Sequence, residues 1–274
     1  MPGTLYLVAT PIGNLADFTQ RAIASLKQAN FIACEDTRQT AKLLEAYGID
    51  KPMRSYHEHN DAERSVEWAA EFEAGRTIAL VSDGGMPLVS DPGYRLVRAA
   101  IEAGAAVVPI PGASAAICAL AASGLPTDAF YFGGFLPAKP SQRRAVLEAV
   151  CEIEATLIFY EAPHRILESL KDVAAVLGDR ACAVARELTK VHEEFLRGTV
   201  SEVSNTLGAR PAIKGEITLL IGRPIAVARA LGDADLTSEV AEIEASGKSR
   251  MEAIKTLAKR YGIGKRDVYK ALNP

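Results

Sequence analysis

The sequence predicts an α/β protein with two α/β domains and a small helical module at its C-terminus. Short apolar runs alternate with amphipathic stretches through the first half, a pattern typical of a largely parallel sheet covered on both faces. A second series of such runs follows a break at residues 123–130, and a basic segment of helical periodicity ends the chain. We therefore predict domains over residues 1–123, 124–224 and 225–274.

The first domain is expected to open with a strand, because an apolar run follows directly on the N-terminus. Three of its amphipathic stretches end at Gly48, Gly75 and Gly104, which suit the stop of a helix. The expected strands cover residues 5–9, 31–34, 77–81 and 106–110, and the expected helices cover residues 17–28, 39–47, 63–73, 94–103 and 114–122.

The second domain repeats the alternation with shorter connections. Separations of hairpin length late in this half indicate a mixed, partly antiparallel sheet. The expected strands cover residues 131–135, 156–160, 181–185, 193–198 and 216–221, and the expected helices cover residues 141–150 and 163–177.

The C-terminal module is predicted to be a basic pair of helices, residues 249–261 and 265–272, around the turn Gly262-Ile263-Gly264. Residues 246–274 carry a net charge of +6, although the whole chain carries −3. This resembles a helix-turn-helix with a polyanionic partner, and a purely structural helix pair is the alternative. The apolar faces are expected to hold Met251, Ile254, Leu257, Ala258 and Tyr261, and then Val268, Tyr269 and Leu272.

The composition is that of a globular protein, with 49% hydrophobic and 24% charged residues. No apolar run reaches the roughly 18 residues of a membrane span, and the N-terminus lacks the features of a signal peptide. A cytoplasmic protein without a membrane partner is expected. The cysteines are far apart with no C-x-x-C pair, which favours free thiols over disulfides or zinc: Cys34, Cys118, Cys151 and Cys182.

Three loops that follow predicted strands carry the chemistry, since ligands of open α/β sheets bind where strands end. They are TPIGNL (residues 10–15), SDGGMPLVSDPG (82–93) and PIPGASAA (109–116). None is a G-x-G-x-x-G dinucleotide fingerprint, which disfavours a nicotinamide-dependent oxidoreductase. Asp83 and Asp91 are candidates for a ribose hydroxyl or a cationic amine, with local turns as the alternative, and Ser114 is a candidate helix N-cap.

Eight motifs stand in the same order and spacing as in one family, and together they cover nearly the whole chain. The chain resembles the ribosomal RNA small subunit methyltransferase I family, of the tetrapyrrole-methylase-like class. The motifs are TPIGNL, EDTR (35–38), HEHN (57–60), SDGGMPLVSDPG, PGASAA, GFLPAK (134–139), FYEAPHR (159–165) and ARELTK (185–190). One departure is SDGGMP in place of the usual SDAGTP, so Met86 replaces a threonine hydroxyl.

The resemblance implies a homodimer with the cofactor S-adenosyl-L-methionine in a cleft between two α/β domains. It further implies methyl transfer to the 2′-hydroxyl of a cytidine in the decoding region of 16S ribosomal RNA, so that the small ribosomal subunit is the partner. The expected cofactor site joins the residues that the resemblance assigns with one carboxylate candidate of the SDGG loop, Asp83. The full set is Ile12, Gly13, Asp83, Gly84, Gly85, Met86, Val89, Ser114, Ala115, Tyr160 and Leu188.

The general base is left open by the sequence, because a poor nucleophile such as a ribose hydroxyl has several candidate proton acceptors here. Those are His57, His59, Glu35, Asp36, Glu161 and Glu187. The two histidines of HEHN invite a metal interpretation, but no third ligand stands nearby, so no metal is expected. Candidates for neutralising RNA phosphates are Arg38, Lys139, Arg143, Arg144, Arg165, Arg186 and Lys190, each with an exposed solvated charge as its alternative.

Two other functions remain as alternatives at this point. A tetrapyrrole-type methylase would act on a small molecule with the same fold, but it would lack the basic C-terminal pair and the EDTR, HEHN and FYEAPHR motifs. A non-catalytic RNA-binding or ribosome-assembly module would fail to bind S-adenosylmethionine.

Overall fold

The computed structural model describes residues 2–224, 236–245, 247–261 and 264–272. The chain divides into two compact units, Met1–Arg223 and Pro224–Pro274. The first unit holds both predicted sheets, and the second holds the C-terminal helices.

The first sheet consists of five parallel strands in the order β3-β2-β4-β1-β5. Four of them were predicted, and β3 was missed because it is only three half-buried residues long. The strands are β1 (Thr4–Val8), β2 (Phe31–Cys34), β3 (Met53–Ser55), β4 (Thr77–Val81) and β5 (Ala106–Ile110). The helices that connect them are α1 (Gln20–Gln28), α2 (Thr37–Ala46), α3 (Asp61–Glu73) and α4 (Tyr94–Glu102).

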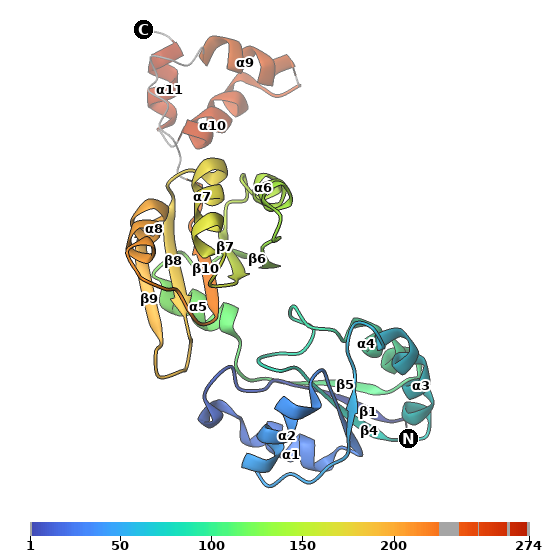
Figure 1. Ribbon diagram of the computed structural model, residues 1–274. Helices are drawn as coiled ribbons and strands as arrows, with labels where there is room; N and C mark the ends of the chain where they lie inside the picture. The colour runs from blue at the N-terminus through green and yellow to red at the C-terminus, as the bar shows by residue number, and fades with distance from the viewer. Residues whose placement is uncertain (1, 225–235, 246, 262–263, 273–274) are drawn as a thin grey trace. The chain divides into compact units, whose positions relative to one another are not determined.

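Both faces of the first sheet are covered, as predicted, because successive strand residues point to opposite faces. In β1, Val8 packs with α1 and α2 around Leu26, whereas Leu5 packs with α3 and α4 around Trp68. Figure 1 shows these two helix pairs on opposite sides of the sheet. Helix α1 begins later than predicted, because Thr19 accepts a hydrogen bond from the backbone N–H of Ala22 and so sets its N-cap.

The second sheet is mixed, as predicted, in the order β6-β7-β10-β8-β9. Strands β6 and β7 are parallel, and the remaining pairs are antiparallel. Helices α6 (Pro140–Ala149), α7 (Ile166–Leu177) and α8 (Val200–Gly208) pack on one face. The strands are β6 (Phe130–Phe135), β7 (Thr156–Glu161), β8 (Ala181–Arg186), β9 (Glu194–Thr199) and β10 (Ile217–Ile221).

Helix α5 (Ala115–Ser123) covers the other face of the second sheet. Its buried Ala119 and Leu120 pack against Ile158 and Leu220 of β7 and β10. The change from the first sheet to the second therefore falls before Ala115, not after residue 123 as predicted. The helix is apolar on all sides, which is why its periodicity could not show which sheet it would cover.

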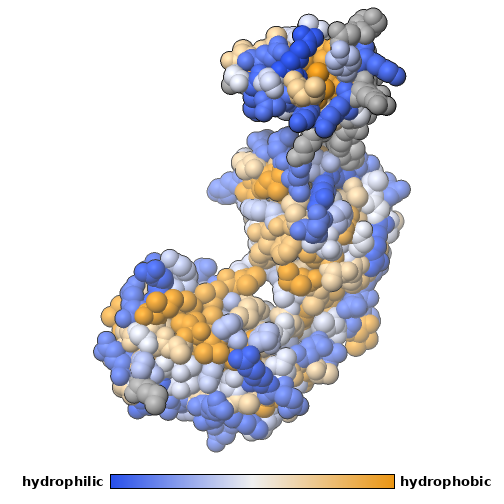
Figure 2. Space-filling view, turned by 180° about the vertical axis from the view of Figure 1, so that it is seen from behind, coloured by the Kyte–Doolittle hydropathy of each residue, from blue (hydrophilic) through white to orange (hydrophobic). Residues whose placement is uncertain are grey.

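The C-terminal unit contains α9 (Leu236–Ala245), α10 (Arg250–Tyr261) and α11 (Lys265–Leu272) around its own apolar core. Helix α9, which was not predicted, contributes Leu236 and Val240 to that core. The predicted core positions Met251 and Tyr269 are instead exposed. The predicted turn at residues 262–263 lies outside the described residues. Hydrophilic side chains cover much of the face of this unit that Figure 2 draws.

The four cysteines are free thiols, and Cys34 and Cys182 are buried in strands. Among the described residues, no helix has the length and apolarity to cross a membrane.

Candidate functional site

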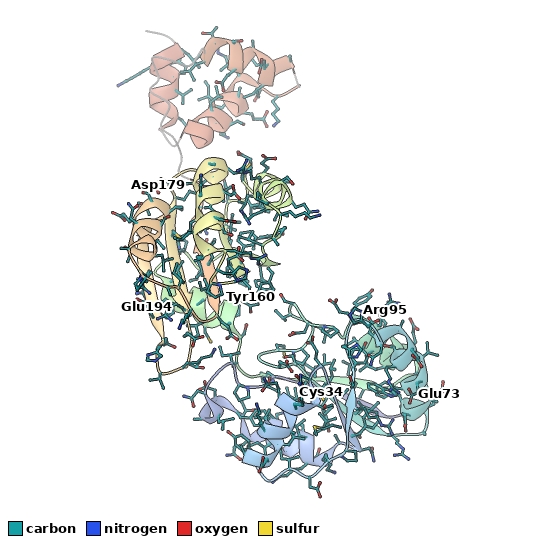
Figure 3. The ribbon with its side chains drawn as sticks, viewed as in Figure 1. Cys34, Glu73, Arg95, Tyr160, Asp179 and Glu194 are labelled. Atoms are coloured by element: carbon teal, nitrogen blue, oxygen red, sulfur yellow. The ribbon has the colours of Figure 1, made fainter. Side chains whose placement is uncertain are left out.

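A cavity of about 810 Å³ lies where the loops that follow the first-sheet strands meet residues of the second sheet. Figure 3 shows Tyr160 on the side of the second sheet that lies toward those loops, and Figure 2 shows the hollow in the first unit from behind. All eleven residues predicted for the cofactor line this cavity: Ile12, Gly13, Asp83, Gly84, Gly85, Met86, Val89, Ser114, Ala115, Tyr160 and Leu188. Their binding of a cofactor stays a prediction.

Two of the cavity loops are joined by a short antiparallel bridge. The backbone N–H of Thr10 donates to Gly85 O at 2.9 Å, and the N–H of Gly85 donates to Thr10 O at 3.0 Å. The hydroxyl of Thr10, which is buried, donates to Ser82 O at 3.0 Å. These bonds fix the loop after β1 to the loop after β4, so the cavity floor is preorganised by backbone pairing.

The loop after β4 holds unusual backbone conformations. Leu88 and Ser90 both have φ of +71°, in the left-handed region that side chains with a Cβ rarely adopt. Such conformations cluster at ligand sites, where the surrounding structure enforces them. A Cβ on Gly134 of β6 would lie 3.3 Å from Ser90 Oγ, so this loop reaches the second sheet.

Two glycines of the cavity differ in what a side chain would meet. A Cβ on Gly13 would lie 2.5 Å from Lys190 Cγ, and its φ of +156° is unfavourable for other residues. A Cβ on Gly84 would lie 3.5 Å from Pro11 O, an ordinary contact, so the structure accommodates the alanine that relatives of this motif usually carry. Gly13 is therefore required sterically and Gly84 is not.

The carboxyl groups of the β2 and β4 loops form an acidic cluster beside the cavity. Burial, followed by the charge of Glu35, raises the pKa of Asp91 to about 6. Burial and the charge of Asp36 raise the pKa of Asp83, despite a hydrogen bond from the Asp36 backbone. Burial and the charge of Asp83 likewise raise the pKa of Glu35, which does not line the cavity. No described basic side chain forms an ion pair with Asp83 or Asp91, so the cluster favours a cationic ligand.

The N-terminus of α5 is closed by a residue of the second sheet. Ser114 is the N-cap residue of α5, as predicted, although its side chain makes no capping hydrogen bond. The phenol oxygen of Tyr160 instead accepts the backbone N–H of Ala116. Burial raises the pKa of Tyr160, so its phenol stays neutral and fixes the edge of β7 to the start of α5.

Glu161 lines the cavity, but its carboxylate is occupied by other groups. It accepts the backbone N–H of Ala162 at 2.7 Å, an ion pair from Arg165 at 2.6 Å and a hydrogen bond from the Ser169 hydroxyl. Its side chain is fully buried. Glu161 therefore positions the turn after β7, and it has little capacity left to accept a proton from a substrate.

Lys190 also lines the cavity, between two carboxylates. Its Nζ lies 2.9 Å from Glu187 Oε1 and 3.0 Å from Glu216 Oε2. Burial opposes its charge, but these two hydrogen bonds outweigh burial and raise the pKa of Lys190. Because its charge is compensated and its methylenes cover Gly13, Lys190 packs the loop after β1.

The remaining candidates for phosphate contact lie outside the cavity lining and differ in exposure. Arg143 is only 1% exposed, and its guanidinium pairs with Asp172 at 2.6 Å. We withdraw it as an RNA contact, since reaching a phosphate would break a buried ion pair. Arg144 pairs with the same Asp172 and is 55% exposed. Arg38 and Lys139 are exposed, and Arg165 is largely buried on Glu161.

Neither histidine of the HEHN motif lines the cavity. The ring of His57 lies 3.4 Å from the side-chain amide of Asn60, and the rings of His57 and His59 stand edge to face at 5.9 Å. Among the described residues, no group of three potential ligands is placed to hold a metal ion. Asp36 caps α2 and pairs with Arg38, which lowers its pKa to about 2, so it too is a structural carboxylate.

Helix α2 supplies a part of the lining that was not predicted. Gln39, Thr40, Lys42 and Leu43 face the cavity, and Phe135, 59% exposed, lines it from β6. The signal for α2 was available, because EDTR follows a parallel strand at the same edge of the sheet as the glycine loops.

Comparisons with known proteins agree with this fold. Residues 4–204 match the sequence model of the family described as Tetrapyrrole (Corrin/Porphyrin) Methylases. The chain is 52% identical to the ribosomal RNA small subunit methyltransferase I of Halalkalibacterium halodurans, covering 97% of this chain and 93% of the relative. It is 49% identical to the protein of that name from Mesorhizobium japonicum, and the match covers 98% of this chain and 90% of the relative.

Two solved structures show the same fold at low sequence identity. A diphthine synthase superposes with a TM-score of 0.60 at 17% identity, covering 80% of this chain and 90% of its own. The uroporphyrin-III-C-methyltransferase from Thermus thermophilus superposes with a TM-score of 0.56 at 20% identity, covering 80% of this chain and 94% of its own. At these identities the likeness concerns the fold alone.

Proposed function

The chain belongs to the tetrapyrrole methylase family and, within it, to the ribosomal RNA small subunit methyltransferase I group, and from this premise we propose its reaction. It transfers a methyl group from S-adenosylmethionine to the 2′-hydroxyl of a cytidine in the decoding region of 16S ribosomal RNA. The observation that carries this proposal is a cavity to which the loops of both sheets contribute.

The cavity fits the chemistry of the cofactor. Its glycine loops offer close backbone approach, and the bridged Thr10 and Gly85 hold them in place. Asp83 and Asp91 supply negative charge that no described basic side chain neutralises, which suits a sulfonium and an ammonium group. Apolar side chains such as Ile12, Met86 and Leu188 line the remainder and suit the methylene and ring surfaces.

When bound, S-adenosylmethionine supplies a methyl group already activated on a positively charged sulfur. The protein then has to align the acceptor hydroxyl and exclude water, and such positioning can supply roughly 7–11 kcal/mol of a reaction barrier. We assign the holding of the cofactor to the eleven lining residues named above. Tyr160 and the start of α5 fix the boundary between the loops and the second sheet.

The proposed partner is 16S ribosomal RNA in the small ribosomal subunit, in the cytoplasm. Support comes from the names of the relatives, together with the exposed Arg38, Lys139 and Arg144 and the basic residues of the C-terminal unit. A homodimer is proposed on the family resemblance. Sedimentation equilibrium of the purified protein tests it, with a mass of about 29.2 kDa contradicting the dimer.

The reaction is tested with radiolabelled S-adenosylmethionine and small ribosomal subunits from a strain that lacks the corresponding methylation. The RNA is digested to nucleosides after incubation, and label in a 2′-O-methylated cytidine derivative is the expected result. If calorimetry shows that the protein binds the cofactor but the RNA carries no label, the acceptor is a small molecule instead. A protein that binds RNA but not the cofactor would be a non-catalytic assembly module.

A further inference from the structure

Four carboxylates line the cavity, and two of them are committed to other partners. Glu161 is saturated by Arg165, Ser169 and a backbone N–H. Glu216 is 80% exposed and pairs with Lys190. Asp83 and Asp91 remain, and only these two belong to the loop after β4.

Asp83 and Asp91 differ in what surrounds them. Asp83 is exposed and accepts the backbone N–H of Asp36, which ties it to the start of α2. Asp91 is half-buried, and the neutral group beside it that favours its charged form is the hydroxyl of Ser82, which itself donates to Gly85 O at 3.2 Å. A carboxylate whose oxygens are not taken up by ion pairs keeps free acceptor positions for a substrate proton.

Asp91 also lies close to the second sheet. Its charge acts on the phenol of Tyr160, which is part of β7. The neighbouring Ser90 is within contact range of the position that a Cβ on Gly134 of β6 would occupy. The loop after β4 therefore brings Asp91 to the region where residues of both sheets line the cavity.

We propose that Asp91 is the general base that receives the proton of the acceptor hydroxyl, a role that rests on the proposed methyl transfer. In that reaction the C–O bond forms from a lone pair of the hydroxyl oxygen. The C–S bond breaks with its electron pair on sulfur, and the hydroxyl proton passes to a carboxylate oxygen of Asp91. No further reactant is needed.

The groups that face Asp91 suit it to this task near neutral pH. Burial and the charges of Glu35 and Asp83 raise its pKa to about 6, and the neighbouring Ser82 hydroxyl opposes the rise. The phenol of Tyr160, on the opposite sheet, is neutral. A base with a pKa near the working pH combines the ionised state with a useful proton affinity.

The test compares the variants D91N and E35Q with the wild type in the labelled-subunit assay. D91N should lower kcat at least 100-fold at saturating cofactor, whereas the Kd for S-adenosylmethionine changes less than about 10-fold. E35Q removes a neighbouring negative charge, so it should retain the maximal kcat and move the acid limb of kcat/KM for the cofactor to lower pH. The acid limb should be absent from the residual activity of D91N.

A second readout does not depend on activity. In cofactor-free protein labelled with ¹³C at aspartate carboxyls, one resonance should titrate near pH 6. It should be missing in D91N and titrate at lower pH in E35Q.

Three results would overturn the proposal. D91N with kcat within threefold of the wild type shows that Asp91 is not the base, and E35Q with a 100-fold loss assigns the base to Glu35 instead. D91N with unchanged kcat but weakened cofactor binding makes Asp91 a cofactor ligand. A wild type that transfers no label is a separate failure, since it removes the proposed function itself.

Discussion

Replacing Asp91 with Asn should stabilise the protein above neutral pH, although the same change should lower kcat at least 100-fold. The folded-state pKa of Asp91 is raised from 3.8 to about 6. The folded protein therefore binds this proton more tightly than the unfolded chain, and wild-type stability falls as pH rises from about 4 through 6. An Asn side chain has nearly the same shape as Asp and is neutral at every pH. The gain in stability of D91N over the wild type is consequently absent below pH 4 and complete above pH 7.

The magnitude follows from the size of the shift. A rise of this extent corresponds to about 3 kcal/mol if it is fully expressed in the free energy of unfolding. Asp91 is only half-buried, and solvent screening reduces the expected gain to about 1–1.5 kcal/mol. For a unit of this size, that gain raises the Tm by about 3 °C.

Thermal unfolding of wild type and D91N at pH 4 and pH 8 measures the effect by circular dichroism. Asp179 is the matched control, because hydrogen bonds from Ser201 lower the pKa of that exposed carboxyl (Figure 3). D179N should destabilise at pH 8, the opposite sign. A D91N variant that is less stable than wild type at pH 8, or equally stabilised at pH 4, would refute the electrostatic account.

Three further outcomes are expected. Arg143→Leu should lower the free energy of unfolding in urea by about 3 kcal/mol, since it breaks a buried ion pair. Arg144→Leu removes the exposed partner of the same Asp172 and should lower it by under about 1 kcal/mol. Equal losses would contradict the difference in burial. Gly13→Ala should weaken cofactor binding at least tenfold in calorimetry because its Cβ meets Lys190, while Gly84→Ala should bind within twofold. Lys190→Met should keep RNA affinity within twofold in filter binding, because two carboxylates already compensate that ammonium; a larger loss would restore Lys190 as a phosphate contact.

Much of the fold could be predicted because its strands are buried apolar runs. Segments such as β4 and β10 are hydrophobic except for one threonine each, as strands covered on both faces are. Two helices were missed although the sequence carries signals for them. Thr199 and Glu202 form the capping box that begins α8, and Leu236 and Val240 have the helical spacing of α9.

The cavity could be predicted to the level of loops, since the carboxyl ends of parallel strands converge on one edge. The burial and the pKa of individual side chains could not be predicted. Arg143 stands in a basic stretch that reads as exposed, and only its contact with Asp172, on a different helix, shows that it is buried. The pKa of Asp91 depends on burial and on Glu35, far away in the sequence. Such properties arise from tertiary packing, which periodicity and composition do not encode.

The loop after β4 concentrates features that oppose folding. Leu88 and Ser90 hold left-handed backbone conformations, and Asp91 keeps a half-buried charge beside like charges. These costs are tolerated because the loop is anchored to Thr10 and is followed by α4, which packs Leu96 into the core on the α3–α4 face of the first sheet. Relieving the charge should therefore stabilise the protein and remove its proton acceptor together, which is the trade-off expected where a strained, charged loop is retained for chemistry.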